Sequence, residues 1–159
     1  MDQPTLTTRT TADDVRSIDA IVSALYETIS GPAGERDWFR LRYLFLPQAT
    51  LASTTVEGGR ATLNTRTVEQ FVETAGAHMR EHDFFEREIA RRVERFGHIA
   101  HVFSTYDSRH TAEDKTPFAR GINSIQLLND GKRWWIVTVY WDSERPDNPL
   151  PPQYLPAAK

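Results

Sequence analysis

The stretch GINSIQLLNDGKRWWIVTVYWD, from Gly121 to Asp142, decides the fold, because it carries two runs of β-forming residues around a turn signal. Apolar and β-branched side chains recur in Gly121–Leu128 and Arg133–Asp142. Between them, Asp130-Gly131 is typical of a two-residue hairpin loop. The sequence therefore predicts two paired strands that close on Asp130-Gly131.

Side chains alternate across a strand, so this loop would sort the hairpin into two faces. Both faces are apolar, which differs from a sheet with one face in water. A symmetric homodimer through the outer face would cover the second apolar surface. The expected inner set is Asn123, Ile125, Leu127, Trp134, Ile136, Thr138 and Tyr140, and the expected outer set is Trp135, Val137, Val139 and Trp141.

The segment before this hairpin reads as a second pair of long strands, Phe84–Phe96 and Ile99–Asp107, joined at Gly97-His98. We place Phe96 opposite Ile99, which assigns every other side chain to a face. The inner set is then Phe85, Ile89, Val93, Ala100, Val102, Ser104 and Tyr106. The other face holds Glu86, Glu88, Glu94, His101, Phe103 and Asp107, and cross-strand ion pairs with Arg87, Arg91, Arg92 and Arg95 explain its charges better than anion binding does.

Helical patterns fill the first half of the chain. A capping-box spacing at Thr11–Asp14 opens an amphipathic helix that ends near Ser30-Gly31-Pro32. A second helix is expected from Glu35–Asp37 until Pro47 stops it, followed by a short strand at 49–56. A second capping box at Thr67–Gln70 opens a third helix.

The chain reads as one domain with two extensions. Residues 1–10 are polar and predict a loose arm, and 11–142 form the α+β domain. Residues 143–159 form a proline-rich tail that can be neither helix nor inner strand. Leu150, Tyr154 and Leu155 could pin this tail to the body or to a partner subunit.

Composition excludes several classes of protein. The net charge is −3 with both signs interspersed, which disfavours a nucleic-acid partner. The absence of cysteine excludes disulfides, thiolate metal sites and cysteine nucleophiles. No apolar run approaches the length of a signal peptide's core or a membrane span, so a cytoplasmic location without membrane contact is expected.

Three motifs carry a family resemblance. The stretch Gly131–Ile136 looks like the last strand of nuclear-transport-factor-two-like (NTF2-like) proteins. The pair Phe96–Ala100 and Ser104–Tyr106 is similar to a strand pair of that superfamily, and Asp37-Trp38 leading to Leu46-Pro47 resembles the second helix of its SnoaL-like members. The resemblance covers roughly residues 12–142.

The resemblance implies an α+β cone, in which a strongly bent, mostly antiparallel sheet wraps around three N-terminal helices and leaves an apolar pocket. Members of the superfamily include ketosteroid isomerases, scytalone-type dehydratases, polyketide cyclases, epoxide hydrolases and small subunits of ring-hydroxylating dioxygenases. Others only bind partners, so the fold alone does not give the chemistry.

Catalysis in such a pocket needs a base and a hydrogen-bond donor for a developing oxyanion. The resemblance makes Asp37 and His82 the candidate bases, although Asp37 also fits a helix cap and His82 a solvated helix end. His101 would reach the pocket only if the strand register slipped by one residue. His78–His82 spells H-x-x-E-H, a zinc-protease pattern, but no third ligand is evident and we expect neither a metal nor another cofactor.

Inner-face polar groups supply the candidate donors, namely Tyr106, Asn123 and Tyr140, although a self-satisfied hydrogen-bond network explains them equally well. Further ligand-binding candidates come from the inner strand faces and from the first two helices. They are Tyr26, Trp38, Tyr43, Val102, Ser104, Trp134, Ile136 and Thr138.

The sequence thus favours a SnoaL-like domain that binds a small apolar organic molecule. It would act as a cofactor-free lyase, isomerase or cyclase by proton transfer. The alternatives are a non-catalytic ligand-binding domain and an association domain resembling a dioxygenase small subunit. A carboxylate or histidine lining the pocket within reach of a Tyr or Asn would favour the enzyme.

Overall fold

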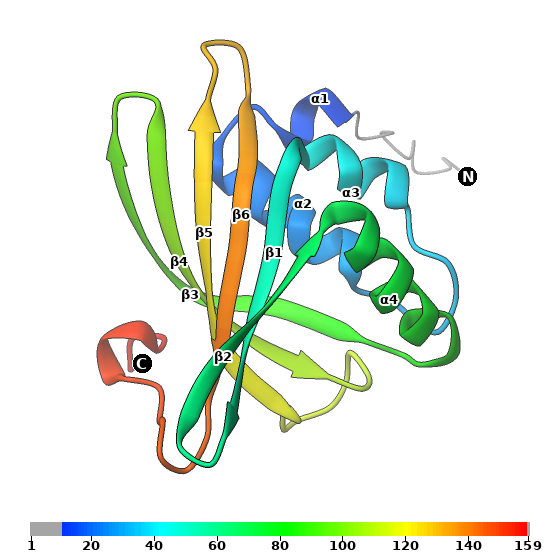
Figure 1. The fold of residues 1–159 in the computed structure, drawn as a ribbon, viewed down its shortest axis with the longest axis vertical. Coiled ribbons are helices and arrows are strands. Elements are labelled where there is room, and N and C mark those ends of the chain that lie inside the picture. Colours follow the sequence, from blue (N-terminus) through cyan, green and yellow to red (C-terminus); the bar gives the residue numbers. More distant parts are fainter. Residues whose placement is uncertain (1–10, 159) are drawn as a thin grey trace, which may run out of the picture.

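The structure, a computed structural model, describes residues 11–158, so the predicted arm at 1–10 lies outside the described residues. Within these residues, three helices come first, six strands follow with a fourth helix between the second and the third, and the proline-rich tail comes last (Figure 1). The helices are α1 (Thr11–Asp14), α2 (Ile18–Ile29), α3 (Trp38–Leu44) and α4 (Val68–Glu81), with a 3-10 turn η1 (Pro152–Tyr154). The strands are β1 (Phe45–Glu57), β2 (Arg60–Thr67), β3 (Phe85–Phe96), β4 (Ile99–Arg109), β5 (Ala119–Asn129) and β6 (Trp134–Ser143).

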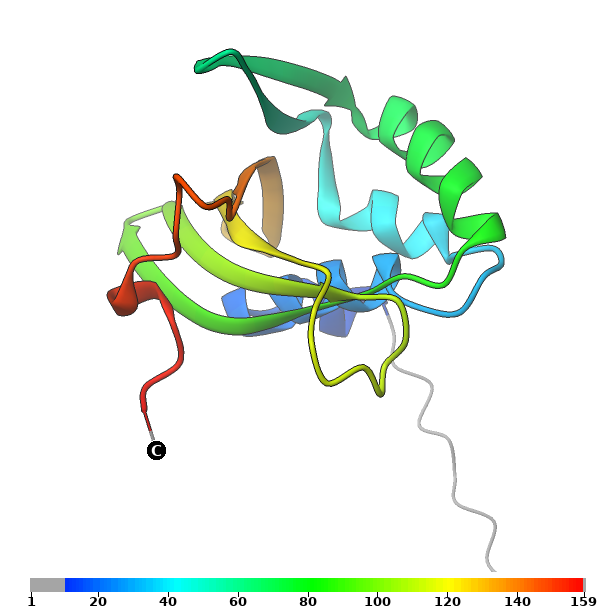
Figure 2. The ribbon, with the colours of Figure 1, turned by 90° about the horizontal axis from the view of Figure 1, so that it is seen from below.

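The six strands form one sheet in the order β2-β1-β6-β5-β4-β3. Every neighbouring pair is antiparallel except β1 and β6, which run parallel. The sheet bends strongly, and α2 and α3 lie against its inner side while α4 extends beside β1 and β2 (Figure 2). The predicted α+β cone with a mostly antiparallel sheet is confirmed.

Local capping explains where the helices begin. The first helix does not run unbroken from Thr11, because the chain turns after Asp14 and Ser17 caps α2 by accepting a hydrogen bond from the Ala20 amide at 3.0 Å. Asp37 caps α3, and Thr67 and Gln70 form the predicted capping box of α4. Strand β1 starts at Phe45, earlier than expected, and β2 was not predicted.

The core lies between α2, α3 and the inner face of the sheet. Ile21, Leu41, Leu44, Ile125 and Ile136 are fully buried there. An ion pair ties the helices together at its edge, since Arg40 donates two hydrogen bonds to the buried Asp14 (2.7 and 2.9 Å) and one to Glu27 (2.7 Å). No helix within residues 11–158 is long and apolar enough to cross a bilayer.

The β5–β6 hairpin has a different loop from the predicted one. Asn129 pairs with Trp134, so four residues form the loop instead of two. The side chain of Asp130 accepts hydrogen bonds from the amides of Lys132 and Arg133 (2.8 and 2.9 Å), and this local turn competes with the tight hairpin. The pairing partner of Asn129 moves by two residues, an even number, so the faces of β6 near the turn are unchanged. Trp134 and Ile136 therefore keep their predicted inner positions and are buried.

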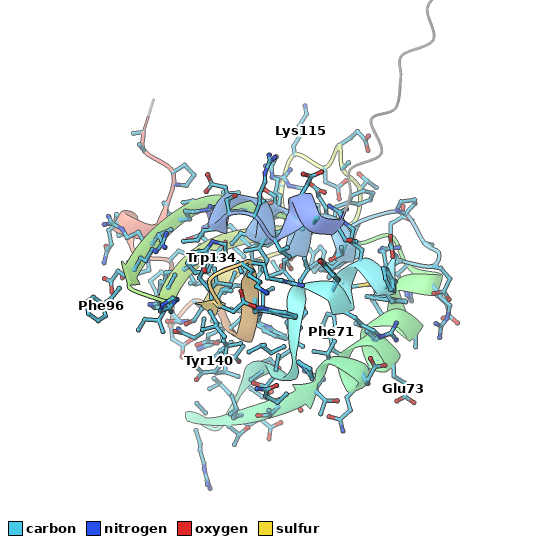
Figure 3. The ribbon with its side chains drawn as sticks, turned by 90° about the horizontal axis from the view of Figure 1, so that it is seen from above. Phe71, Glu73, Phe96, Lys115, Trp134 and Tyr140 are labelled. Carbon is cyan, nitrogen blue, oxygen red and sulfur yellow. The ribbon has the colours of Figure 1, made fainter. Side chains whose placement is uncertain are left out.

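The tail crosses the outer face of the sheet. The Tyr154 carbonyl accepts a hydrogen bond from the buried Thr105 hydroxyl at 2.6 Å, and its ring lies 5.1 Å from that of Phe103. The expectation that the tail contains no helix is corrected by η1, a single 3-10 turn that prolines tolerate at its start. Elsewhere large apolar groups stay exposed, as at Phe96, which projects from the end of β3 and is 84% exposed (Figure 3).

Candidate active site

A mostly apolar cavity of about 250 Å³ lies between α2, α4 and the inner face of the sheet. Figure 3 shows one of its walls, Phe71, between α4 and β1. Within the described chain, the lining side chains include a single carboxylate and none with a positive charge. They are Leu25, Tyr26, Ile29, Leu51, Phe71, Met79, Phe84, Glu86, Tyr106, Ser108, Ala119, Asn123, Val139 and Trp141.

Glu86 is the carboxylate in this cavity, and a β-bulge puts it there. The predicted pairing of Phe96 with Ile99 is confirmed and holds as far as Ala90 with Thr105. The register then shifts between Glu88 and Ala90, so that Glu88 pairs with Tyr106 and Glu86 with Ser108. The extra residue reverses the faces of the first half of β3. The expectation that Glu86 lies on the outer, ion-paired face is therefore wrong.

The end of α2 fixes the backbone at this point. The Ser30 hydroxyl donates to the Glu86 carbonyl at 2.9 Å and accepts from the Glu86 amide at 3.0 Å. Both backbone groups of Glu86 are thus tied to the helix that forms the cavity wall. This anchoring holds the Glu86 side chain against the cavity.

Burial raises the pKa of Glu86 to about 7, because the charged form loses its hydration in the apolar cavity. The nearby charge of Asp107 adds to the rise. Two hydrogen bonds oppose it, one from the Ser108 hydroxyl at 3.0 Å and a long one from the Asn123 amide at 3.5 Å. A carboxyl that ionises near neutral pH can both take and return a proton.

Beside Glu86, the cavity lining holds the Asn123 amide and the phenols of Tyr26 and Tyr106. Asn123 donates its amide to the Tyr26 hydroxyl at 3.0 Å, and the Tyr26 hydroxyl lies 2.7 Å from that of Ser104. Tyr106 contacts Ser143 at 3.3 Å, a distance that leaves its hydroxyl weakly held. Burial raises the pKa of Tyr106 to about 12 and that of Tyr26 further, so both phenols keep their protons.

The structure brings some predicted ligand-binding residues to the cavity and leaves others in the core. Tyr26, Tyr106 and Asn123 line it. Ser104 is outside the lining but its hydroxyl is hydrogen-bonded to that of Tyr26. Others face inward but pack in the hydrophobic core away from the cavity lining, namely Val102, Trp134 and Ile136 together with the partly buried Trp38 and Tyr43.

Tyr140 and Thr138 do not face the cavity, contrary to expectation. The β5–β6 register shifts between Gln126 and Leu127, so Leu127 pairs with Ile136 but Gln126 pairs with Thr138. This second bulge turns Tyr140 outward, where it is 46% exposed, and lets the Thr138 hydroxyl meet that of Thr50 at 2.9 Å. The same shift turns Trp141 inward, into the cavity wall.

The candidate bases chosen from the sequence lie elsewhere. Asp37 is exposed and accepts the Arg40 amide at 2.9 Å as a helix cap. His82 is exposed at the end of α4, where its ring stacks on that of His78 at 4.3 Å. His101 points to the outer face and lies 3.0 Å from the Ser124 hydroxyl. No group of three or more His, Cys, Asp or Glu side chains in residues 11–158 could hold a metal ion.

Glu86 could not be found from the alternation of side chains, because a bulge leaves no certain mark in one sequence. A weaker signal was present. The run Glu86-Arg-Glu-Ile89 puts two carboxylates at even positions of β3, and Ser104, Tyr106 and Ser108 place hydroxyls at even positions of β4. A bulge between the strands makes these polar sets face one another.

No protein-family model and no curated protein sequence matches this chain. Solved structures of low identity do match. LinA superposes with a TM-score of 0.60 at 12% identity, over 89% of this chain and 91% of LinA. A provisionally assigned ketosteroid isomerase from Parabacteroides distasonis gives 0.56 at 16% identity, over 84% and 98%.

An NTF-2 like protein of unknown function from Silicibacter pomeroyi matches with a TM-score of 0.51 at 18% identity, over 80% of this chain and 92% of that protein. These matches cover nearly the whole of each relative. The chain therefore has the NTF2-like fold that its sequence motifs predict.

Proposed function

We propose that this protein is a cofactor-free enzyme that moves a proton on a small, neutral, largely apolar organic molecule, with Glu86 as the base. The observation that carries the proposal is a carboxyl group with a pKa of about 7 inside an apolar cavity, beside Asn and Tyr donors. A carboxylate in the pocket within reach of a Tyr or Asn is the feature that the sequence leads us to expect of an enzyme.

The chemistry follows from the positions of these groups. Ionised Glu86 would remove a proton from a carbon next to a carbonyl, and the negative charge would move to the carbonyl oxygen. Tyr106 and Asn123, which line the same cavity, would donate hydrogen bonds to that oxygen and so lower the barrier in a dry site. Protonated Glu86 could then return the proton to another carbon, giving an isomerase, or a leaving group could depart, giving a lyase.

The cavity limits the substrate. Its volume of about 250 Å³ is below the roughly 300–1,000 Å³ of typical ligand pockets, which favours a single-ring or short-chain compound. An anionic substrate would meet the Glu86 carboxylate without a compensating cation among the described lining residues. A neutral carbonyl compound fits these limits.

Hydrogen exchange tests the proposal without knowledge of the natural substrate. The protein is incubated in D₂O with a panel of small cyclic and open-chain ketones, and deuterium uptake at carbon is followed by mass spectrometry. We expect uptake above the buffer rate for at least one ketone with the wild type and its loss in Glu86→Gln. Glu94→Gln removes the same charge from an exposed part of β3 and should leave uptake unchanged.

If Glu86→Gln exchanged deuterium as fast as the wild type, Glu86 would not be the base. Uptake that is absent for the whole panel, together with binding of ketones by the wild type, would contradict the proton-transfer proposal and favour the non-catalytic alternative.

One observation supports a second candidate function, non-catalytic binding of an organic cation. Five aromatic side chains surround the single carboxylate, and aromatic faces attract cations. Thermal-shift measurements with small ammonium compounds and their uncharged carbon analogues separate the two functions, since only the cation site would prefer the ammonium member of each pair. The aromatic residues are Tyr26, Phe71, Phe84, Tyr106 and Trp141.

The homodimer through the outer sheet face also remains a proposal. The tail covers Phe103 and Thr105, while Val137 and Tyr140 stay exposed on the same face. We expect sedimentation velocity at micromolar concentration to report a dimer, and Val137→Glu to convert it to a monomer without loss of the fold. A monomeric wild type would contradict this proposal.

A further inference from the structure

A chain of hydrogen bonds leads from the cavity to the protein surface. It starts at Asn123, whose amide donates to Tyr26 at 3.0 Å, and continues from Tyr26 to Ser104 at 2.7 Å. The Ser104 hydroxyl in turn donates to Glu88. Tyr26, Ser104 and Asn123 are all buried, so water does not compete with these bonds.

The outer end of this chain is a carboxylate held by arginine. Glu88 accepts a hydrogen bond from Arg91 Nε at 2.7 Å, and Arg91 also binds Asp19 on α2. Both Glu88 and Arg91 are one-fifth exposed, in a cleft that Glu27 and Arg87 also line. Glu88 therefore acts as an acceptor for Ser104, not as a donor.

Proton counting then fixes the direction of every bond. A hydroxyl has one proton to donate. Because Ser104 donates its proton to Glu88, it can only accept a hydrogen bond from Tyr26. Tyr26 donates its proton to Ser104, so its hydroxyl can only accept a hydrogen bond from Asn123. The atom of Asn123 that faces Tyr26 must be the amide nitrogen, because a carbonyl oxygen there would find no proton.

We infer that Glu88 and Ser104 are positioning residues, which act through Tyr26 to make Asn123 present its amide N–H, and not its carbonyl, to Glu86 and to a bound molecule. Asn123 Nδ2 lies 3.5 Å from Glu86 Oε1 in this orientation. A flipped amide would put a carbonyl oxygen against the carboxylate and repel it. The catalytic value of this role rests on the proton transfer proposed above, in which the unflipped amide stabilises first ionised Glu86 and then the product oxyanion.

The titration of Glu86 reports this orientation in the free protein. Asp107 on β4 favours the neutral form, and the donors Ser108 and Asn123 favour the charged form. Tyr26 on α2 and Tyr106 on β4 also interact electrostatically with Glu86, but both phenols keep their protons. The carboxyl midpoint can be followed by NMR of protein carrying ¹³C at the glutamate δ carbon. The variants are Ser104→Ala and Glu88→Gln.

The sign of the change separates positioning from simple charge. Removing the Glu88 charge would by Coulomb's law lower the Glu86 midpoint, because one like charge disappears. Freeing Asn123 to flip would raise it. We expect Ser104→Ala, which changes no charge, to raise the midpoint by a few tenths of a pH unit or more. In Glu88→Gln the carbonyl oxygen has to accept from Arg91, so the amide nitrogen faces Ser104 and reverses the chain of hydrogen bonds. We therefore expect Glu88→Gln to raise the midpoint as well, despite the lost charge.

The control is Glu94→Gln, which should leave the midpoint where the wild type has it. An unchanged midpoint in Ser104→Ala together with a lowered one in Glu88→Gln would overturn the inference. The titration needs no substrate, so it stands apart from the deuterium assay. A raised midpoint without any exchange activity would contradict the enzyme and leave the positioning role intact.

Discussion

Replacing Glu86 with glutamine is expected to stabilise the folded protein at pH 8 by about 3 kcal/mol, while it removes any proton-transfer activity. The Glu86 carboxyl has a pKa near 4.5 in the unfolded chain and about 7 in the folded one. Between these values the unfolded chain has released the proton and the folded chain still holds it. The free energy of unfolding therefore falls as the pH rises through this window, by about 1.4 kcal/mol for each pH unit, and stays low above it.

Glutamine has the shape of the neutral carboxyl and does not ionise, so the variant loses this dependence. Thermal unfolding of both proteins at half-unit steps from pH 4 to pH 8.5 measures the effect. The difference in melting temperature should be small at pH 4 and grow to about 10 °C at pH 8, for a chain of this length. Other titrating groups contribute equally to both proteins and cancel in the difference.

Glu94→Gln is the matched control, and its difference from the wild type should stay flat over the same range. A Glu86→Gln variant that is less stable than the wild type at pH 8 would show that the carboxylate is favourably solvated or paired. The raised pKa, and with it the proposed base, would then be untenable.

A measured stability cost of this kind would support a functional role for the cavity. A chain selected only for stability would place an apolar residue or glutamine beside Phe84, Tyr106 and Trp141. With its raised pKa, a carboxyl group there is expected to lower the free energy of unfolding at neutral pH. Such a cost is typical of catalytic and binding sites, where strongly shifted pKa values concentrate.

Much of the sheet could be predicted from the sequence, because alternation is a reliable guide wherever strands pair without interruption. Side chains along β4 alternate as predicted, with Val102, Ser104 and Tyr106 buried on the inner face. The β3–β4 turn at Gly97-His98 also has the expected register, with Phe96 opposite Ile99. Gly97 has a positive φ of 54°, which a tight turn of this kind requires.

The candidate site could be predicted only in part, because two bulges decide it. Each inserts one residue and exchanges the faces of the strand beyond it. One brings Glu86 into the cavity, and the other exchanges Tyr140 for Trp141 in the cavity wall. Asn123 was found because the extra residue lies on β6, so alternation along β5 is uninterrupted, and Tyr26 lies on a helix. The choice of Asp37 and His82 rested on positions in relatives and not on the residues' own surroundings.

A glycine on β5 gives the second large expected effect, because Tyr106, which lines the cavity, lies where the side chain of any other residue would be. A Cβ atom built at Gly121 would lie 2.7 Å from Cζ of Tyr106, and closer still to the Tyr106 hydroxyl and to the backbone oxygen of Asp142. The backbone oxygen cannot yield without breaking the pairing of β5 with β6. The glycine thus leaves the space that the Tyr106 ring occupies.

Its control is a second glycine, whose replacement meets a side chain and no backbone atom. At Gly76, inside α4, a Cβ would lie 3.3 Å from the Trp38 ring, a tight but adjustable contact with a side chain. Alanine is also favoured over glycine in a helix by about 1 kcal/mol. Gly76→Ala should therefore change the free energy of unfolding little, and it should leave the exchange assay unchanged.

Gly121→Ala is expected to lower the free energy of unfolding by about 3 kcal/mol, as overpacked cores do, and to slow deuterium exchange roughly 100-fold by displacing the Tyr106 hydroxyl. Denaturant unfolding of Gly121→Ala, Tyr106→Phe and the double variant measures the first effect. Because phenylalanine lacks the hydroxyl that the new methyl group meets, the double variant should be more stable than the two separate losses predict. Strictly additive losses would mean that the methyl group strains only the β5–β6 backbone, and an unchanged exchange rate in Gly121→Ala would remove Tyr106 from the reaction.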